Sequence, residues 1–123
     1  MALNQFSRTQ LLLGQESMDL LANATVAVFG IGGVGGYTVE ALARSGVGHF
    51  VLVDDDKVCL TNINRQIIAT RSSVGKYKVD VMKERILDIN PKAEVEVYAF
   101  ICRKMRTILI FRSIHTWWML LIP

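Results

Sequence analysis

The sequence predicts an α/β fold built on a doubly wound parallel sheet, and two observations indicate this class. Runs such as "TVAVFG" and "HFVLVD" are rich in β-branched and aromatic residues without polar alternation, which is typical of buried parallel strands. These runs alternate with helical segments in the order strand, helix, strand, helix, strand, which favours parallel pairing through crossover helices. The 123 residues are enough for one small domain with a single core.

The individual elements follow from periodicity and from end signals. Gly46 is a stop signal for the helix that follows the first strand. A later, longer helix is apolar along one side from Val79 to Ile89. The polar stretch between these helices is expected to be irregular, with one helical turn near Ile67. The expected elements are helices over 4–14 and 15–24, a strand over 25–30, a helix over 33–46, a strand over 49–54, a helix over 73–90 and a strand over 93–100.

Gly30, Gly32 and Gly35 form a GxGxxG pattern where the first strand passes into a helix. The first glycine permits a tight turn, the second lets backbone approach a phosphate, and the third lets helix pack on strand. The helix N-terminus then faces the anion. Asp54 lies 19 residues beyond Gly35, at the end of the second strand, where a ribose-binding carboxylate belongs. The pattern predicts a nucleotide site; the alternative is a glycine-rich turn that serves packing alone. The pattern does not distinguish NAD from ATP as the bound nucleotide.

The stretch "VDDDKVCLTNINRQ" distinguishes between NAD and ATP as the predicted ligand. An NAD-binding domain needs one acid at this strand end. Here three carboxylates precede Asn62 and Arg65, and Lys78 follows on a helix. Such cations can neutralise a γ-phosphate, which a dinucleotide lacks, so the pattern disfavours a nicotinamide-dependent oxidoreductase. Taken singly, Arg65 and Lys78 could be ordinary solvated side chains; their register with the other motifs favours a phosphate-binding role.

Four motifs in register resemble those of the ubiquitin-activating-enzyme-like adenylyltransferases, a family that includes the sulfur-carrier activators of thiamine and molybdopterin synthesis. The motifs are "GIGGVG", "VDDDKV", "TNINRQ" and "VGKYK", and the resemblance covers residues 4–100. It implies a Rossmann-like ATP-binding domain over 1–100. It also implies ATP and Mg²⁺ as cofactors, and a homodimer for the full-length protein.

The resemblance further implies roles for matching residues. Arg65 and Lys78 are expected to counter charge as pyrophosphate departs, and Arg8 to reach the γ-phosphate of a neighbouring subunit. Asp54 is expected to hold the ribose hydroxyls, and Asp56 to support its loop. No metal ligand is predicted among these residues. The expected nucleotide-binding set is Gly30, Gly32, Gly33, Gly35, Asp54, Asp56, Thr61, Asn62, Arg65 and Lys78.

Within the family, "TNINRQIIAT" and "SVGKYKVDVMKERILDINP" are most similar to the bacterial tRNA threonylcarbamoyladenosine dehydratases. This similarity implies that ATP activates the carboxylate of the threonylcarbamoyl group on tRNA and that an intramolecular attack closes a ring. The alternative partner is a ubiquitin-like sulfur-carrier protein, adenylated by the same chemistry. A sulfur-transfer protein is a further expected partner. No secretory signal is visible, so a cytoplasmic location without membrane contact is expected.

The tail after Phe100 departs from the family pattern. Residues 101–123 contain four of the 14 basic residues, none of the 11 acidic ones and both tryptophans. A membrane span is not expected, because Arg106, Arg112 and His115 interrupt the apolar run. We expect that this tail is read out of frame. The single codons of tryptophan and methionine force Val-Asp into the frame one base earlier, and the family has an Asp-x-x-Asp motif in this region.

Two expectations follow from this interpretation. The nucleotide-binding fold is truncated after the third strand, so the sheet is incomplete. The chain then retains the phosphate loop but is an inactive, non-catalytic fragment of the enzyme.

Overall fold

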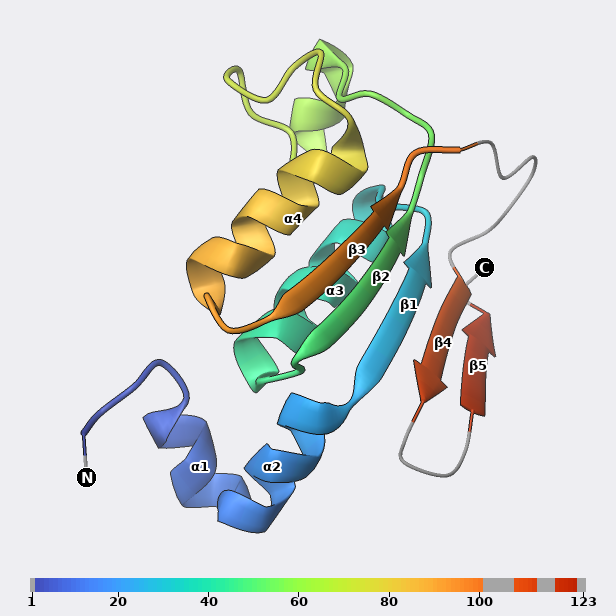
Figure 1. Ribbon diagram of the computed structural model, residues 1–123. Coiled ribbons are helices and arrows are strands. Elements are labelled where there is room, and N and C mark those ends of the chain that lie inside the picture. Colours follow the sequence, from blue (N-terminus) through green and yellow to red (C-terminus); the bar gives the residue numbers. More distant parts are fainter. Residues whose placement is uncertain (1, 101–107, 113–116, 122–123) are drawn as a thin grey trace.

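Three parallel strands form the centre of the protein (Figure 1). The computed structural model describes residues 2–100, 108–112 and 117–121. Strand β2 pairs in parallel with β1 on one side and with β3 on the other, in the register Thr25↔His49 and His49↔Glu94. The predicted parallel α/β arrangement is confirmed. The strands are β1 (Thr25–Phe29), β2 (His49–Val53) and β3 (Glu94–Tyr98).

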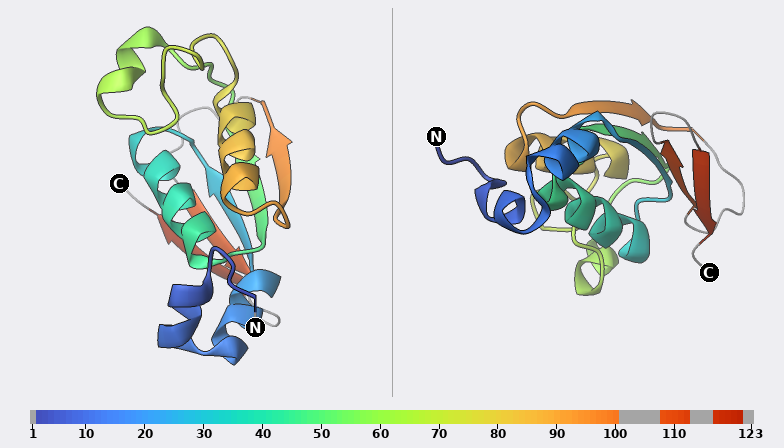
Figure 2. Two further views of the ribbon diagram at one scale, coloured as in Figure 1. Left: turned by 90° about the vertical axis from the view of Figure 1, so that its left-hand side faces the viewer. Right: turned by 90° about the horizontal axis from the view of Figure 1, so that it is seen from below.

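Two crossover helices connect these strands and cover one face of the sheet (Figure 2). Helix α3 (Gly33–Ser45) joins β1 to β2, and α4 (Lys78–Ile89) joins β2 to β3. Gly46 ends α3 in the left-handed conformation with φ of 106°, as its stop signal predicted. Strands β1 to β3 and helices α3 and α4 thus correspond to the first half of a doubly wound sheet. Among the described residues, both crossover helices lie on the same face.

The core lies between the sheet and these two helices. Val26 and Val28 of β1, and Phe50 and Leu52 of β2, are buried at alternate positions. They pack in one cluster with apolar side chains of both helices, including Val39, Met82 and Ile86. The opposite face of β3 is polar and exposed, so the burial alternates along the strand as it does in a one-sided sheet.

Two short helices precede the sheet and lie at its other end from the loops that follow β1 and β2 (Figure 1). They are α1 (Ser7–Leu13) and α2 (Gln15–Asn23), as the sequence predicts. Gly48, just before β2, lies in close contact with α2. Its N–H donates to Leu21 O at 3.2 Å, and a Cβ at this position would lie 2.0 Å from Ala22 O. Only glycine fits at this contact.

The structure corrects two sequence expectations. The helix expected from residue 73 begins at Lys78, because Gly75 has φ of 88° and the segment before the helix pairs with Asp56–Val58 instead. The helical turn expected near Ile67 lies earlier, as a 3₁₀ turn over Leu60–Asn64. Its position is fixed by the side chain of Asn62, whose Oδ1 accepts the Cys59 N–H at 2.9 Å.

Much of the tail that we expect to be out of frame lies outside the described residues. Within the described part, β4 (Ile108–Arg112) and β5 (Trp117–Leu121) extend the sheet to the order β3-β2-β1-β4-β5. Strand β4 is antiparallel to β1, at the position where a doubly wound sheet has a parallel strand. The sequence does not predict these two strands.

None of the described helices has the length and apolar character that crossing a membrane requires.

A buried carboxylate joins the two crossover helices. Glu40 of α3 accepts hydrogen bonds from Arg44 Nε at 2.8 Å and from Arg85 Nη2 at 3.0 Å, and it also pairs with Arg85 Nε. The hydrogen bond from Arg85 is the largest cause that lowers the pKa of Glu40 from its usual value, against the opposing effect of burial. The ionised carboxylate therefore stabilises the packing of α4 on α3.

We expect Glu40→Gln to lower the free energy of unfolding at pH 7 by about 1–3 kcal/mol, because a charged hydrogen-bond acceptor is lost. The folded pKa of Glu40 lies below the unfolded one, so its contribution is complete above the unfolded pKa and is lost as pH falls through the folded pKa. Urea denaturation across this range measures the difference between wild type and variant, which should shrink on acidification. The exposed Glu84→Gln on α4 is the control, and an equal loss there would contradict the assignment.

Gly48→Ala tests the contact between α2 and β2. We expect it to destabilise the fold by about 2–3 kcal/mol, because backbone atoms must move to admit the methyl group. Gly75→Ala is the control, since a Cβ there meets nothing within 4 Å and only the positive φ is strained, at about 1 kcal/mol. Urea denaturation midpoints compare the two variants, and a smaller effect at Gly48 would refute the close approach.

Candidate functional site

The glycine loop lies between β1 and α3, at the carboxyl end of the parallel strands. Gly30 has φ of 91°, a conformation that favours glycine, and its N–H donates to Val53 O at 2.8 Å. Gly32 then occupies the N-cap position of α3. No side chain caps this helix, so its first N–H groups stay available to an anion.

Asp54 bonds to the glycine loop. Its Oδ2 accepts the Ile31 N–H at 2.6 Å, and its Oδ1 accepts the Asp56 N–H at 2.8 Å. Asp54 is half-buried, at the end of β2 and directly beside the loop that the GxGxxG pattern identifies. The predicted ribose-binding carboxylate is therefore at the expected strand end. In addition it has a structural role, because it fixes the loop after β1 to the loop after β2.

The "TNINRQ" segment folds onto the glycine loop. A Cβ on Gly32 would lie 3.8 Å from Gln66 Nε2, and a Cβ on Gly33 would lie 3.8 Å from Arg65 O. Gly36, one turn further along α3, is in closer contact, since a Cβ there would meet Ile67 Cγ2 at 3.3 Å. Two predicted motifs that are far apart in the sequence thus form one surface.

Asn62 and Arg65 differ in their environments. Asn62 is buried, and its side-chain and backbone oxygens hold the 3₁₀ turn together by accepting the N–H groups of Cys59, Arg65 and Gln66. The side chain of Arg65 is exposed, and its Nη1 donates to Thr61 O at 3.2 Å and Asn64 Oδ1 at 2.9 Å. Asn62 therefore shapes the loop, whereas Arg65 offers a cation at its surface.

Gln66 is a residue that the predicted set leaves out. It is only 7% exposed, and its Oε1 is buried without a hydrogen-bond partner among the residues that the structure describes. An unpaired buried polar atom costs about 1–3 kcal/mol. The signal was present in the sequence, because Gln66 is the last residue of the motif.

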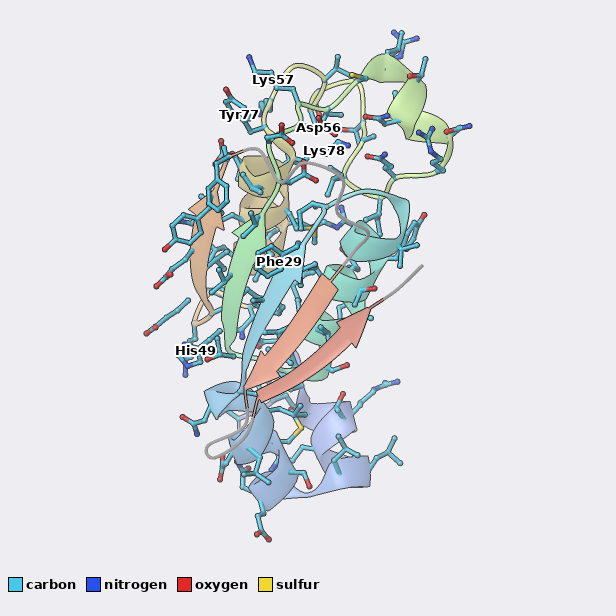
Figure 3. The ribbon with its side chains drawn as sticks, turned by 90° about the vertical axis from the view of Figure 1, so that its right-hand side faces the viewer. Phe29, His49, Asp56, Lys57, Tyr77 and Lys78 are labelled. Carbon is cyan, nitrogen blue, oxygen red and sulfur yellow. The ribbon has the colours of Figure 1, made fainter. Side chains whose placement is uncertain are left out.

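Lys78 is a buried cation in an unfavourable position. It is the first residue of α4, where the helix dipole disfavours positive charge, and its side chain is 7% exposed. Its Nζ lies 3.6 Å from Asp56 Oδ2, and its N–H donates to Asp56 O at 3.0 Å (Figure 3). Lys57 lies beside Tyr77, with its Nζ 5.0 Å from the ring centroid. The structure thus keeps the ammonium group of Lys78 at the carboxyl end of the sheet, where the exposed carboxylate of Asp56 neutralises it.

Arg8 lies elsewhere. It is exposed on α1, at the opposite end of the sheet from the glycine loop (Figure 1). The chain does not bring this residue to the glycine loop, so the role predicted for it requires a second subunit.

The carboxylates of Asp54, Asp55 and Asp56 lie close together, with oxygen atoms within 4.8 Å of one another. Asp54 already accepts two backbone N–H groups, and Asp56 pairs with Lys78. These partners explain why the acids gather here. Two of the three carboxylates are thus engaged by protein partners among the described residues.

Comparison with known proteins agrees with this geometry. The ThiF family model matches residues 6–115. The tRNA threonylcarbamoyladenosine dehydratase of Bacillus subtilis (strain 168) is 59% identical over 93 residues, which are 76% of this chain and 37% of that protein. The enzyme of the same name from Escherichia coli (strain K12) is 50% identical over 93 residues, 76% of this chain and 35% of that protein. This chain therefore spans little more than a third of the length of these relatives.

A solved structure shows a similar fold with a nucleotide bound. It is the E. coli tRNA N6-threonylcarbamoyladenosine dehydratase in complex with ATP, with a TM-score of 0.77 and 48% identity over 79% of this chain and 40% of that one. The family model covers most of the chain, and it matches the region in which the glycine loop, the acidic strand end and the "TNINRQ" turn meet. The chain belongs to the ThiF family.

Proposed function

We propose that residues 1–100 are the nucleotide-binding part of an ATP-dependent dehydratase that cyclises threonylcarbamoyladenosine in tRNA. The observation that supports this most directly is the packing of the "TNINRQ" turn on the glycine loop, beside Gly32 and Gly33. This arrangement surrounds an uncapped helix N-terminus with residues suited to a triphosphate. The similarity to dehydratases, one of them bound to ATP, supports the choice of nucleotide and substrate.

The proposed reaction proceeds in two steps. A carboxylate oxygen of the threonylcarbamoyl group attacks the α-phosphorus of ATP, and the bond to the leaving pyrophosphate breaks. A nitrogen or oxygen of the same group then attacks the acyl carbon and closes the ring, which releases the N–H proton of that group and expels AMP, which keeps the carboxylate oxygen. The protein contributes position and charge rather than a covalent intermediate.

Lys78 and Arg65 are proposed to counter the charge that develops on the departing pyrophosphate. Lys78 is buried and preorganised, and Asp56 holds its ammonium group until phosphate oxygens replace that carboxylate. Arg65 is exposed and is held by Thr61 and Asn64 on the outer side of the turn. Asp54 is proposed to accept ribose hydroxyls with the lone pairs that Ile31 and Asp56 do not use.

Other parts of the proposal concern the whole protein. A homodimer would bring Arg8 of one subunit to the nucleotide of the other. Magnesium would accompany the triphosphate. A cytoplasmic location is proposed because the substrate is tRNA. For residues 1–123 alone we propose nucleotide binding without turnover.

The second candidate function is adenylation of a ubiquitin-like sulfur-carrier protein, possible because both reactions activate a carboxylate with ATP. Incubating the full-length protein with ATP and either modified tRNA or a sulfur carrier separates the two. Formation of cyclic nucleoside together with AMP supports dehydration. Adenylation of the carrier, with tRNA unchanged, would favour the alternative.

We also propose that the ATP-binding domain ends at residue 100 and that residues 101–123 are read out of frame. Sequencing the gene from the codon of Glu94 to beyond that of Pro123 tests whether the tail is out of frame. We expect a missing base near the codon of Phe100. An unchanged reading frame would contradict this interpretation.

Lys78→Gln tests the triphosphate site. We expect ATP affinity to fall about 10- to 100-fold, because a buried ammonium that faces phosphate is lost, while adenosine binding changes little. Calorimetric titration of both ligands into the purified protein measures the difference. Lys83→Gln, on the same helix, is the control and should bind ATP like the wild type. An equal fall for ATP and adenosine would show that Lys78 supports the fold only.

A further inference from the structure

Basic residues gather in one segment of the chain, which runs from the loop after β2 into the first turns of α4. Residues 57–83 contain six basic residues and one acidic residue, whereas the rest of residues 1–100 contains four basic and ten acidic residues. The loops of this segment lie at the carboxyl end of the sheet (Figure 1). Among the described residues, Lys78 is the one member of the six with a carboxylate within 4.0 Å of its charged group. Charge asymmetry of this kind is typical of a surface that binds nucleic acid.

Three of these lysines line a groove beside α4. The groove has a volume of about 510 Å³, and Lys57, Lys76 and Lys83 contribute to its walls. Lys57 and Lys76 come from the loops before α4 and are exposed, whereas Lys83 comes from α4 itself. Pockets of this size hold ligands as large as a nucleotide. The positive charge of residues 57–83 is therefore concentrated around a concave surface.

The groove adjoins the candidate nucleotide site. Lys57 and Tyr77 pair as an antiparallel bridge, and the next residues along the two segments are Asp56 and Lys78, which pair with each other at the site. All four side chains lie together beyond the carboxyl ends of the strands (Figure 3). Successive residues of paired extended segments point to opposite sides. The groove and the nucleotide site thus lie on the two sides of one paired segment.

The side chains of the groove indicate the class of ligand. Lys57 Nζ lies 5.0 Å from the centroid of the Tyr77 ring, a contact that holds the ammonium group without neutralising its charge. Tyr77 is 40% exposed, so part of its ring is accessible to a base. Asp80 and Glu84 of α4 also line the groove, and carboxylates can accept the exocyclic amino group of a base. Cations, an aromatic ring and acceptors together fit single-stranded nucleic acid better than an acidic peptide, which has neither bases nor amino donors on its side chains.

We propose that this groove binds the single-stranded loop of an RNA, with Lys57, Lys76 and Lys83 on its phosphates and Tyr77 stacked on a base. The inference rests on the proposed function, in which tRNA is the substrate, and adds a surface for the nucleotides that flank the reacting one. Because these contacts neutralise phosphates, RNA affinity should fall as the salt concentration rises. The groove has no part in holding ATP.

The test measures RNA binding by the purified full-length protein. The probe is a fluorescently labelled RNA hairpin with the sequence of a tRNA anticodon stem and loop, titrated by anisotropy over a range of salt concentrations. The variants are Lys57→Gln and Lys76→Gln, singly and together, and Tyr77→Leu. Lys92→Gln is the matched control, because Lys92 is exposed in the turn between α4 and β3, at the other end of the sheet. Polyglutamate is the second probe, and each variant is also checked by thermal unfolding and by titration with ATP.

We expect each single lysine variant to bind the hairpin about fivefold more weakly at about 0.1 M salt, and the double variant about 20- to 30-fold more weakly. The slope of log affinity against log salt concentration should become shallower by about 0.7 for each lysine removed. Tyr77→Leu should weaken binding about fivefold or more with the slope unchanged, because base stacking is lost. Lys92→Gln should behave like the wild type, and ATP affinity should be the same in every variant.

Equal affinity and slope in the wild type and the double variant would overturn this inference, while formation of cyclic nucleoside would leave the proposed function intact. Polyglutamate binding that the lysine variants abolish and Tyr77→Leu spares would also overturn it, since the groove would then fit an acidic protein segment. A matching loss of ATP affinity would show that these lysines serve the nucleotide site instead. If the wild type neither binds the hairpin nor forms cyclic nucleoside, the proposed function fails together with this inference. If Tyr77→Leu does not fold, the salt slopes of the lysine variants decide.

Discussion

The arrangement at the carboxyl end of the sheet depends on the carboxylate of Asp54. One oxygen accepts the Ile31 N–H of the glycine loop, and the other accepts the Asp56 N–H of the following loop. This bridge ties together two strand ends that parallel pairing has already placed side by side. Together with the bond from the Gly30 N–H to Val53 O, the bridge restrains a glycine-rich turn that restricts its own backbone very little.

A second set of contacts extends this framework outward. Asp56 binds Lys78 through both its backbone and its side chain, so the start of α4 is fixed to the loop after β2. Asn62 closes the turn that places Gln66 against Gly32. The three segments each place polar groups at the carboxyl end of the sheet. Hydrogen bonds to the backbone hold these segments in place.

The hydrogen bonds of Glu40 with Arg44 and Arg85 stabilise the fold at a distance from the glycine loop. It connects α3 and α4, the two helices whose N-termini lie at the carboxyl end of the sheet. The packing of one helix on the other thereby limits how far Lys78 can move relative to the glycine loop. These two helices belong both to the core and to the candidate site, because each has its N-terminus at the carboxyl end of the sheet and its apolar side in the core.

Several features could be predicted from local sequence alone. Strands β1, β2 and β3, helices α1 to α3 and the left-handed Gly46 follow from patterns within a few residues, and the structure contains them. The late start of α4 was not predictable, because "SVGKYK" has acceptable helical periodicity and only pairing with Asp56–Val58 prevents helix formation there. The turn at Leu60–Asn64 was placed too late for a similar reason, since an asparagine side chain rather than apolar spacing determines it.

The sequence by itself determined the class of fold, the family motifs and the chemistry suited to a triphosphate, because these depend on residue types at fixed spacing. Only the tertiary structure decided which residues meet. It separates Arg8 from the loop, buries Lys78 against Asp56 and leaves the amide of Gln66 facing Gly32. Contacts between segments more than 20 residues apart depend on how helices pack on the sheet, and no local pattern records that geometry.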